Sequence, residues 1–293
     1  MIGIIGGGTM GLGIAVALAG AGHDITLFEP NSDVRASVDG RLDAIAAEGF
    51  RVVRDRLKVS DDLAAMKSAM FIIEAVPENL DLKRSLYGDL FAILPADTII
   101  ASNTSTLPPD LLAEKLPDDL ARRLLVAHFW NPPYFLPLVE VLSGSRTDPA
   151  ALATTVSLLA DAGLKPVVLD RAVPGFIGNR LQLALVREAL HLLESGVATA
   201  DVIDEVVRSS IGRRWSVTGP FESADLGGIH IFATVSSLLF PVLANQQEGA
   251  ALLADMAARG DTGARVGRGF YEWTSSLRDE VARRRSLLMG GNE

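Results

Sequence analysis

The first residues contain the pattern that most limits how this chain can fold. Residues 2–5 form a short apolar run, which predicts a buried strand. Directly after it, Gly6, Gly8 and Gly11 have the spacing G-x-G-x-x-G, and a helical pattern covers residues 9–22. This order of strand, glycine-rich turn and helix predicts the opening unit of a doubly wound α/β sheet that binds a dinucleotide.

The residues of this turn have different physical roles in such a site. Gly6 permits the tight turn, Gly8 lets a pyrophosphate approach the backbone, and Gly11 lets the helix pack close to the sheet. The N–H groups at the helix start, near Thr9 and Met10, attract phosphates together with the positive end of the helix dipole. We therefore expect these five residues to bind the cofactor.

A carboxylate follows the second predicted strand, residues 25–28. Glu29 stands where it can bind the ribose hydroxyls, and it would repel a 2′-phosphate, so the sequence favours NAD over NADP. Arg35 could in principle receive a 2′-phosphate, but we expect a solvated surface arginine. Glycine is common in this chain, with 27 residues, so the motif alone is weak evidence. The strand, the helix and the acid together support the NAD site.

Composition limits the classes of partner. The chain has 293 residues, which suggests two domains, and a formal net charge of −9, which argues against nucleic acid or an anionic membrane. It contains no cysteine, so disulfides, a thiolate nucleophile and Cys-bound zinc are excluded. The apolar runs are too short to span a membrane, and no basic leader precedes the first strand. We expect a cytoplasmic protein.

Strand and helix patterns alternate in the first part of the chain. They predict a mostly parallel Rossmann-type sheet with helices on both faces over residues 1–172. Residues 31–62 are charged and rich in alanine, and they predict one or two helices. The further strands are predicted at residues 70–73, 98–101, 124–127, 138–142 and 167–169.

The pattern changes near Ala172, and no convincing strand follows before the tail. Residues 173–293 therefore predict an all-helical C-terminal domain. Its first helix, residues 176–195, is apolar around most of its circumference and must be covered by its own domain or by a second subunit. The other helices are predicted at residues 199–209, 229–243, 250–258 and 278–285.

Two residues could form a catalytic pair. His128 ends a predicted strand, and Glu140 lies inside an apolar strand, where a carboxylate needs a partner. An imidazole held by a carboxylate is a good general base for an alcohol proton. From the residues alone, a satisfied strand-end histidine and an unrelated glutamate remain the alternative. The other three histidines lack metal-ligand spacing, and we expect no metal site.

Other polar residues have simple alternatives to a functional role. Ser105 and Asn103 lie in a loop at the functional end of the sheet, where such side chains usually satisfy backbone groups. Asn179, at the start of an apolar helix, could make a helix-start hydrogen bond. Arg213 and Arg214 fall in a predicted loop, either as a solvated pair or as a clamp for a substrate carboxylate.

Taken together, these motifs resemble the 3-hydroxyacyl-CoA dehydrogenase family over nearly the whole chain. Their order along the chain is highly specific. The motifs lie at residues 6–11, 74–80, 102–105, 128–132, 138–141, 174–180, 219–221 and 267–271.

The resemblance implies roles for the polar residues. His128 would take the proton of the substrate's C3 hydroxyl while hydride passes to the nicotinamide, and Glu140 would orient the imidazole ring and stabilise the imidazolium. Ser105 and Asn179 would hydrogen-bond the substrate oxygen, and Asn131 would shape the pocket.

The family also implies cofactor contacts and an assembly. Glu78 matches a position near the cofactor ribose, and Asn103 is expected on the cofactor side of the site. The helical C-terminal domain of the family forms a homodimer and closes the cleft.

Three features depart from acyl-CoA members of the family. The segment 29–71 looks shorter than their CoA-holding helical hairpin, and Pro137 stands where they often have lysine. Residues 131–134 and 212–215 look more like relatives that oxidise small hydroxy acids, such as gulonate and carnitine dehydrogenases. There an arginine near Arg214 could hold a carboxylate.

The expected activity is NAD-dependent oxidation of the 3-hydroxyl of a short 3-hydroxyacyl-CoA, as in fatty acid metabolism. The alternatives are a small free 3-hydroxy acid, a carrier-bound acyl group, or an NAD-binding protein without turnover.

Overall fold

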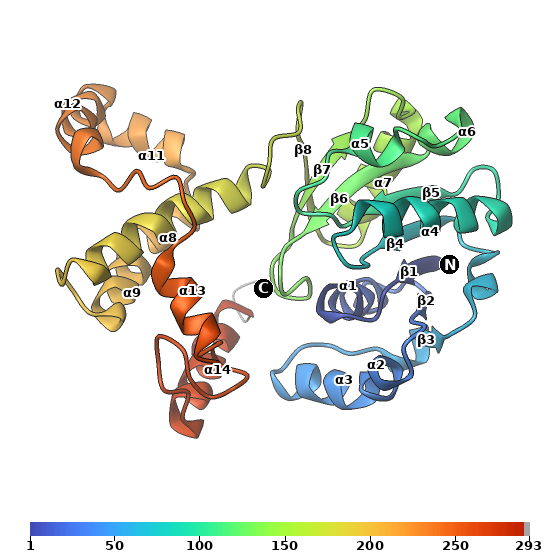
Figure 1. Cartoon of the computed structure of the whole chain (residues 1–293), viewed down its shortest axis with the longest axis horizontal. Coiled ribbons are helices and arrows are strands. Elements are labelled where there is room, and N and C mark those ends of the chain that lie inside the picture. The colour runs from blue at the N-terminus through green and yellow to red at the C-terminus, as the bar shows by residue number, and fades with distance from the viewer. Residues whose placement is uncertain (290–293) are drawn as a thin grey trace. The chain divides into compact units, whose positions relative to one another are not determined.

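The computed structural model of the chain describes residues 1–289. The chain divides into two compact units. The first is Met1–Phe176 together with the segment that begins at Ala282, and the second is Ile177–Val281. Figure 1 labels most of the helices and strands of both units.

Within the described residues, the first unit contains an eight-stranded sheet with the order β3-β2-β1-β4-β5-β6-β7-β8. β6 and β7 run antiparallel, whereas the other neighbouring pairs are parallel. The strand order reverses between β1 and β4, the kind of place where doubly wound sheets bind ligands. The strands are β1 (Ile2–Ile5), β2 (Ile25–Phe28), β3 (Leu57–Ser60), β4 (Phe71–Glu74), β5 (Ile99–Ser102), β6 (Leu124–Phe129), β7 (Leu138–Ser143) and β8 (Lys165–Val168).

Helices cover both faces of this sheet. One face packs against α1, α3 and α7, and the other against α4, α5 and α6. The helices are α1 (Thr9–Gly20), α2 (Ser32–Ala36), α3 (Val38–Ala47), α4 (Leu80–Ile93), α5 (Pro109–Ala113), α6 (Asp118–Ala121) and α7 (Pro149–Asp161), with 3-10 turns η1 (Arg54–Arg56) and η2 (Leu63–Met66).

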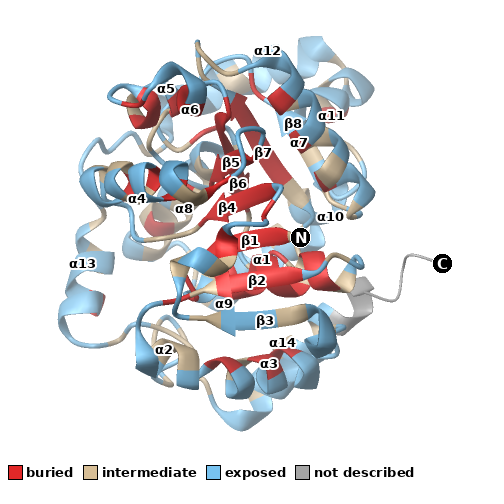
Figure 2. Cartoon of the chain, turned by 90° about the vertical axis from the view of Figure 1, so that its right-hand side faces the viewer, coloured by how far each residue is buried: buried red, intermediate tan, exposed pale blue. Residues whose placement is uncertain are grey.

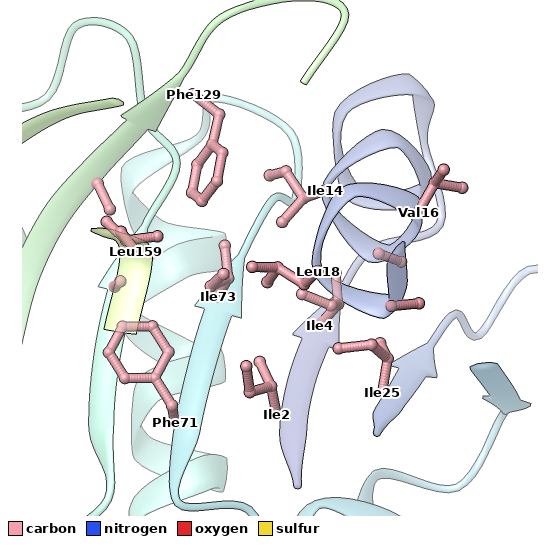
Figure 3. Close-up of a cluster of buried hydrophobic side chains, with 14 of the residues drawn as sticks. Ile2, Ile4, Ile14, Val16, Leu18, Ile25, Phe71, Ile73, Phe129 and Leu159 are labelled. Carbon is pink, nitrogen blue, oxygen red and sulfur yellow. The ribbon is translucent and has the colours of Figure 1, made fainter. Parts of the chain in front are cut away.

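Two hydrophobic cores lie on opposite faces of the sheet. Ile2 and Ile4 of β1 belong to the core on the α1 face, and Ile5 belongs to the core on the α4 face. Likewise, Phe71 of β4 belongs to the core on the α1 face and Ile72 to the core on the α4 face, because successive side chains of a strand point to opposite sides. Burial on both faces explains why these strands read as continuous apolar runs. Figure 3 shows the first core between the sheet and α1.

Helix α1 is buried almost all the way round. The loop after β6 covers its outer face so closely that a β-carbon at Gly13 would lie 2.7 Å from Pro133 Cδ. Phe50 packs against Tyr134 of the same loop, with ring centroids 4.6 Å apart. The glycine-rich turn that begins α1 is therefore held on a rigid helix.

The prediction for residues 31–62 is wrong in one part. That segment forms α2 and α3 but also the edge strand β3, which pairs with β2. Its sequence Leu-Lys-Val-Ser is partly exposed, and Figure 2 shows β3 as a mainly blue strand beside the red interior of the sheet. A short edge strand in which half of the residues are polar contains no apolar run, so the sequence pattern did not predict it. The mostly parallel Rossmann-type sheet followed by a helical domain is confirmed.

The second unit is helical and buries little apolar surface of its own. Within residues 177–281, Leu190, Ser223 and Met256 are the buried residues. The stretch around Arg213 and Arg214, which was predicted as a loop, forms the short helix α10, and residues 220–227, for which no element was predicted, form α11. The helices are α8 (Gly178–Glu194), α9 (Ala200–Ser209), α10 (Ile211–Trp215), α11 (Pro220–Gly227), α12 (Ile229–Leu239), α13 (Ala251–Ala258) and α14 (Ser275–Met289), with the 3-10 turn η3 (Phe240–Val242).

No single helix in the described part of the chain has the length and apolar composition to cross a bilayer. The bent pair formed by α11 and residues 229–242, with an angle of 111° between its halves, meets the criteria by length and composition.

Candidate active site

The glycine-rich turn has the geometry that a dinucleotide needs. Gly6 has a φ of +100°, and a β-carbon there would lie 2.8 Å from the carbonyl oxygen of Ala75. At Gly11 a β-carbon would lie 1.8 Å from the carbonyl oxygen of Gly6. A β-carbon at Gly8 would meet nothing within 4 Å. Gly6 and Gly11 are thus required by the fold, while Gly8 leaves open space at the start of α1.

Glu29 is fixed against this turn. Its Oε2 accepts a hydrogen bond from the Gly7 N–H at 2.7 Å, and its Oε1 accepts one from the Asn31 N–H at 2.9 Å. The carboxylate is therefore held at the end of β2 beside the turn, where a ribose would lie in a dinucleotide site.

Arg35 is not the solvated side chain that was expected. Its guanidinium donates to the carbonyl oxygens of Glu29 and Pro30, each at 2.8 Å, and pairs with Asp61 at 3.0 Å. These contacts hold Arg35 on the backbone next to Glu29. They give Arg35 a structural role at the end of β2.

A buried carboxylate organises the loops at the carboxyl ends of β4 and β5. Glu74 is completely buried, and its Oε1 accepts hydrogen bonds from Lys83 Nζ at 2.6 Å and from the Val76 N–H at 2.9 Å. Its Oε2 accepts from the hydroxyls of Tyr87 and Ser102, each at 2.7 Å. Burial and the neighbouring Glu74 raise the pKa of Tyr87 well above 10. Sequence analysis missed this cluster.

Glu78 joins the loop after β4 to the loop after β5. Its Oε1 accepts from the hydroxyl of Thr104, from the N–H of Ser105 at 3.1 Å, and from the N–H and hydroxyl of Thr106 at 3.1 and 2.7 Å. Its Oε2 lies 3.5 Å from Lys83 Nζ. The carboxylate therefore fixes the backbone of Ser105, while its predicted ribose contact stays a prediction.

Asn103 connects this loop to the end of β6. Its Oδ1 accepts a hydrogen bond from the Phe129 N–H at 2.8 Å, directly beside His128. Ser105 is half-buried in the same loop. The predicted cofactor residues Glu78 and Asn103 thus also hold together the backbone around the predicted catalytic residues.

The predicted catalytic pair lies across the antiparallel strands β6 and β7. His128 and Glu140 are Cα partners in the register, and His128 Nδ1 lies 3.0 Å from Glu140 Oε2. Both are buried, with exposed fractions of 7% and 2%. With the Nδ1 proton directed to the carboxylate, Nε2 is the nitrogen that can accept a substrate proton. Phe176 packs on the imidazole, with ring centroids 5.3 Å apart.

The residues after His128 extend this site. The indole Nε1 of Trp130 donates to Glu140 Oε2 at 3.4 Å, a contact that sequence analysis missed. Asn131 is exposed and precedes Pro132 through a cis peptide bond. The role of Asn131 in shaping a substrate pocket stays a prediction.

Three predicted substrate residues belong to the second unit. Asn179 is half-buried in the first turn of α8. Arg213 and Arg214 are exposed and lie in the short helix α10, so the prediction that they lie in a loop is wrong. The roles of these three residues stay predictions. Among the residues that the structure describes, no cluster of three or more His, Cys, Asp or Glu residues could hold a metal ion.

Comparison with known proteins identifies the relatives of both units. The family model of the 3-hydroxyacyl-CoA dehydrogenase NAD binding domain matches residues 1–172, and that of the C-terminal domain matches residues 175–273. The chain is 34% identical to 5-formyl-3-hydroxy-2-methylpyridine 4-carboxylate 5-dehydrogenase of Mesorhizobium japonicum, over 97% of this chain and 95% of the relative. It is 42% identical to L-carnitine dehydrogenase of Streptomyces griseus, over 76% of this chain and 68% of the relative.

Solved structures agree with the sequence relatives. The crystal structure of a 5-formyl-3-hydroxy-2-methylpyridine 4-carboxylic acid 5-dehydrogenase, described as an NAD+-dependent dismutase, has a TM-score of 0.87 and 32% identity, covering 99% of this chain and 98% of that one. The (S)-3-hydroxybutyryl-CoA dehydrogenase of Ralstonia eutropha has a TM-score of 0.69 and 30% identity, covering 94% and 99%. The predicted family and cofactor are therefore confirmed, and the chain belongs to the 3-hydroxyacyl-CoA dehydrogenase family as an NAD-dependent oxidoreductase.

Proposed function

We propose that this dehydrogenase oxidises a hydroxyl group of a small free carboxylic acid. The observation that carries the proposal is the fold of the segment between β2 and β4. It contains the short helices α2 and α3 and the edge strand β3, and α3 buries Val38, Leu42 and Ile45 in the core of the first unit. This arrangement leaves no long helical hairpin in the described segment to hold a CoA group.

The relatives support a small acid as substrate. One is named for a pyridine carboxylate and another for L-carnitine, and each of these compounds carries a carboxylate. Arg213 and Arg214 in α10 supply exposed guanidinium groups that suit such a group. We assign them to substrate binding on this basis.

The chemistry follows from the arrangement of the first unit. His128 Nε2 accepts the hydroxyl proton of the substrate, and Glu140 stabilises the imidazolium that forms. NAD supplies the acceptor for the hydride. From the resemblance to the family, Ser105, whose backbone N–H is held by Glu78, and Asn179 are assigned as donors of hydrogen bonds to the substrate oxygen. The glycine-rich turn, Thr9, Met10 and Glu29 bind the cofactor.

A second candidate is a short 3-hydroxyacyl-CoA. The family models are named for 3-hydroxyacyl-CoA dehydrogenase, and the Ralstonia eutropha structure is named for (S)-3-hydroxybutyryl-CoA dehydrogenase. The catalytic pair would act in the same way on the C3 hydroxyl of such a substrate. A carrier-bound acyl group would also use the same pair. The free acid, the CoA thioester and the carrier thioester share the hydroxyl that reacts and differ in the group attached to the carboxyl carbon.

The test is NADH absorbance during incubation with NAD and a panel of alcohols. The panel contains L-carnitine, L-gulonate, free L-3-hydroxybutyrate and L-3-hydroxybutyryl-CoA. We expect turnover with at least one free acid and a loss of about 100-fold or more in His128→Ala, because a general base contributes that much. NADH binding, followed by fluorescence, should stay within about twofold in this variant. Turnover confined to the thioester would contradict the free acid, and an active His128→Ala would contradict the base.

We also propose that the protein forms a homodimer through its C-terminal helices. The second unit exposes large apolar residues on α11 and α12, among them Phe221, Leu226 and Leu238 at 86%, 80% and 69%. A second copy of the same unit would cover them. The cytoplasmic location and the lack of a nucleic-acid or membrane partner are proposed from the charge and composition of the chain.

A further inference from the structure

We propose that Trp130 is a positioning residue of the catalytic pair, acting through the carboxylate of Glu140. The indole Nε1 of Trp130 donates to Glu140 Oε2 at 3.4 Å, and His128 Nδ1 lies 3.0 Å from the same oxygen. The inference rests on the proposed function, because it requires His128 to act as the base. Neither the family models nor the relatives' names assign a role to this tryptophan.

The strand geometry places both donors on the same side. Side chains two residues apart on an extended chain point to the same face of the sheet, so Trp130 lies on the face of His128 and of its register partner Glu140. Phe129, between them, points to the opposite side and packs in the core with Val139 and Val141. The imidazole and indole rings lie with centroids 6.4 Å apart, so the carboxylate lies within reach of both.

Two donors on one oxygen constrain the carboxylate more than one does. Glu140 is 2% exposed, and a buried carboxylate keeps its charge only when several donors stabilise it. The indole N–H adds such a donor and limits rotation of the carboxylate around its position beside His128. When His128 becomes imidazolium, this hydrogen bond favours the ionised form of Glu140, so the proton stays on the imidazole.

Phenylalanine at this position would keep an aromatic ring but lose the donor. In Trp130→Phe we expect kcat to fall about fivefold to tenfold, the effect of one hydrogen bond, while KM for NAD stays within about twofold. Trp273→Phe, which changes a half-buried tryptophan outside the residues assigned to substrate or cofactor, is the matched control and should leave both constants unchanged. A kcat that stays at the wild-type value in Trp130→Phe would overturn the proposal.

A spectroscopic test needs no substrate. In protein with ¹⁵N-labelled histidine, the Nδ1–H proton of His128 is identified by its loss in His128→Ala. We expect Trp130→Phe to move this resonance downfield, because a Glu140 oxygen that has lost one donor accepts more strongly from the other. Trp273→Phe should not move it. An unchanged resonance in Trp130→Phe would overturn the proposal.

A second variant covers the case in which Trp130→Phe disturbs packing. Glu140→Gln keeps the tryptophan and its surroundings but removes the charge of the acceptor. The indole N–H resonance of Trp130 should then move upfield, since its hydrogen bond weakens. A resonance that does not move would show that the two groups are not bonded. Activity in His128→Ala would instead overturn the proposed function and leave this contact measurable.

Discussion

At the scale of single residues, buried or half-buried carboxylates organise the site more than any other side chain. Glu74 and Glu78 each accept several donors from separate segments, and Glu140 binds His128. Glu29 accepts a hydrogen bond from the Gly7 N–H and so joins the end of β2 to the glycine-rich turn. Because each carboxylate joins separate segments of the chain, removing its charge should change the positions of those segments as well as one contact.

Glu78 offers a test of this idea through pH. Burial alone would raise its pKa, but hydrogen bonds from Thr104 and Thr106 and the charge of Lys83 lower it below the ordinary 4.5. The native state then binds fewer protons than the unfolded state, so the contribution to stability is present above 4.5 and is lost as the pH falls through the lowered pKa. The free energy of unfolding of the wild type should therefore exceed that of Glu78→Gln at neutral pH, with the difference shrinking in acid.

The measurement is denaturant unfolding of both proteins at several pH values, followed by circular dichroism. Glu272→Gln removes an exposed carboxylate and is the control, for which we expect no such pH-dependent difference. A difference for Glu78→Gln that is the same at neutral and acid pH would contradict the role of its charge.

At the scale of elements, α3 is connected to the cofactor turn. Arg41 of α3 donates from its guanidinium to the carbonyl oxygen of Gly7 at 2.7 Å. This bond fixes the turn and brings a positive charge near the place where the pyrophosphate approaches. We expect Arg41→Gln to raise KM for NAD by about threefold to tenfold, with kcat within about twofold, because it weakens binding and not the chemical step.

A neighbouring arginine provides the control for this experiment. Arg54 pairs with Asp39 and Asp43 of the same helix and makes its bonds at the surface. Arg54→Gln should leave both constants near the wild-type values. An equal rise in KM for both variants would show that α3 as a whole, and not the Arg41 contact, affects the cofactor turn.

Elements also show which parts of the fold the sequence could predict. Apolar runs located every strand of the described sheet except β3, whose Lys58 and Ser60 make it resemble the charged segment around it. The pairing of His128 with Glu140 stayed open in the sequence, because it depends on the antiparallel register of β6 and β7. The resemblance to the family, based on the order of its motifs along the chain, favoured this pair, whereas the 12-residue spacing of His128 and Glu140 alone did not.

Contacts between distant segments were beyond the sequence patterns. The bond between Lys83 and Glu74 requires α4 to pack on β4, and no periodicity specifies which buried charges will meet. The bonds of Arg41 to Gly7 and of Trp130 to Glu140 depend on the local paths of loops in the same way. A glutamate at the end of an apolar strand was the available signal for Glu74, since a buried carboxylate needs a cationic partner.

At the scale of the whole molecule, the two units differ in how they bury apolar surface. The first has cores on both faces of its sheet, whereas the second exposes apolar side chains on most of its helices. On α12, Ile231, Val235 and Leu238 are all exposed, and their spacing places them on one face of the helix. A helix with such a face is stable in water when another apolar surface covers it.

The proposed homodimer makes a prediction about mass. Light scattering of the wild-type protein should give twice the chain mass of 31.1 kDa, and Leu238→Arg should shift it toward the monomer, because a buried unpaired charge opposes association. Met70→Arg places the same charge on an apolar residue of the first unit that is 74% exposed, and it should leave the mass unchanged. A monomeric wild type that binds lipid vesicles would instead assign the apolar surface of α11 and α12 to a membrane, and a monomer that binds none would contradict both assignments.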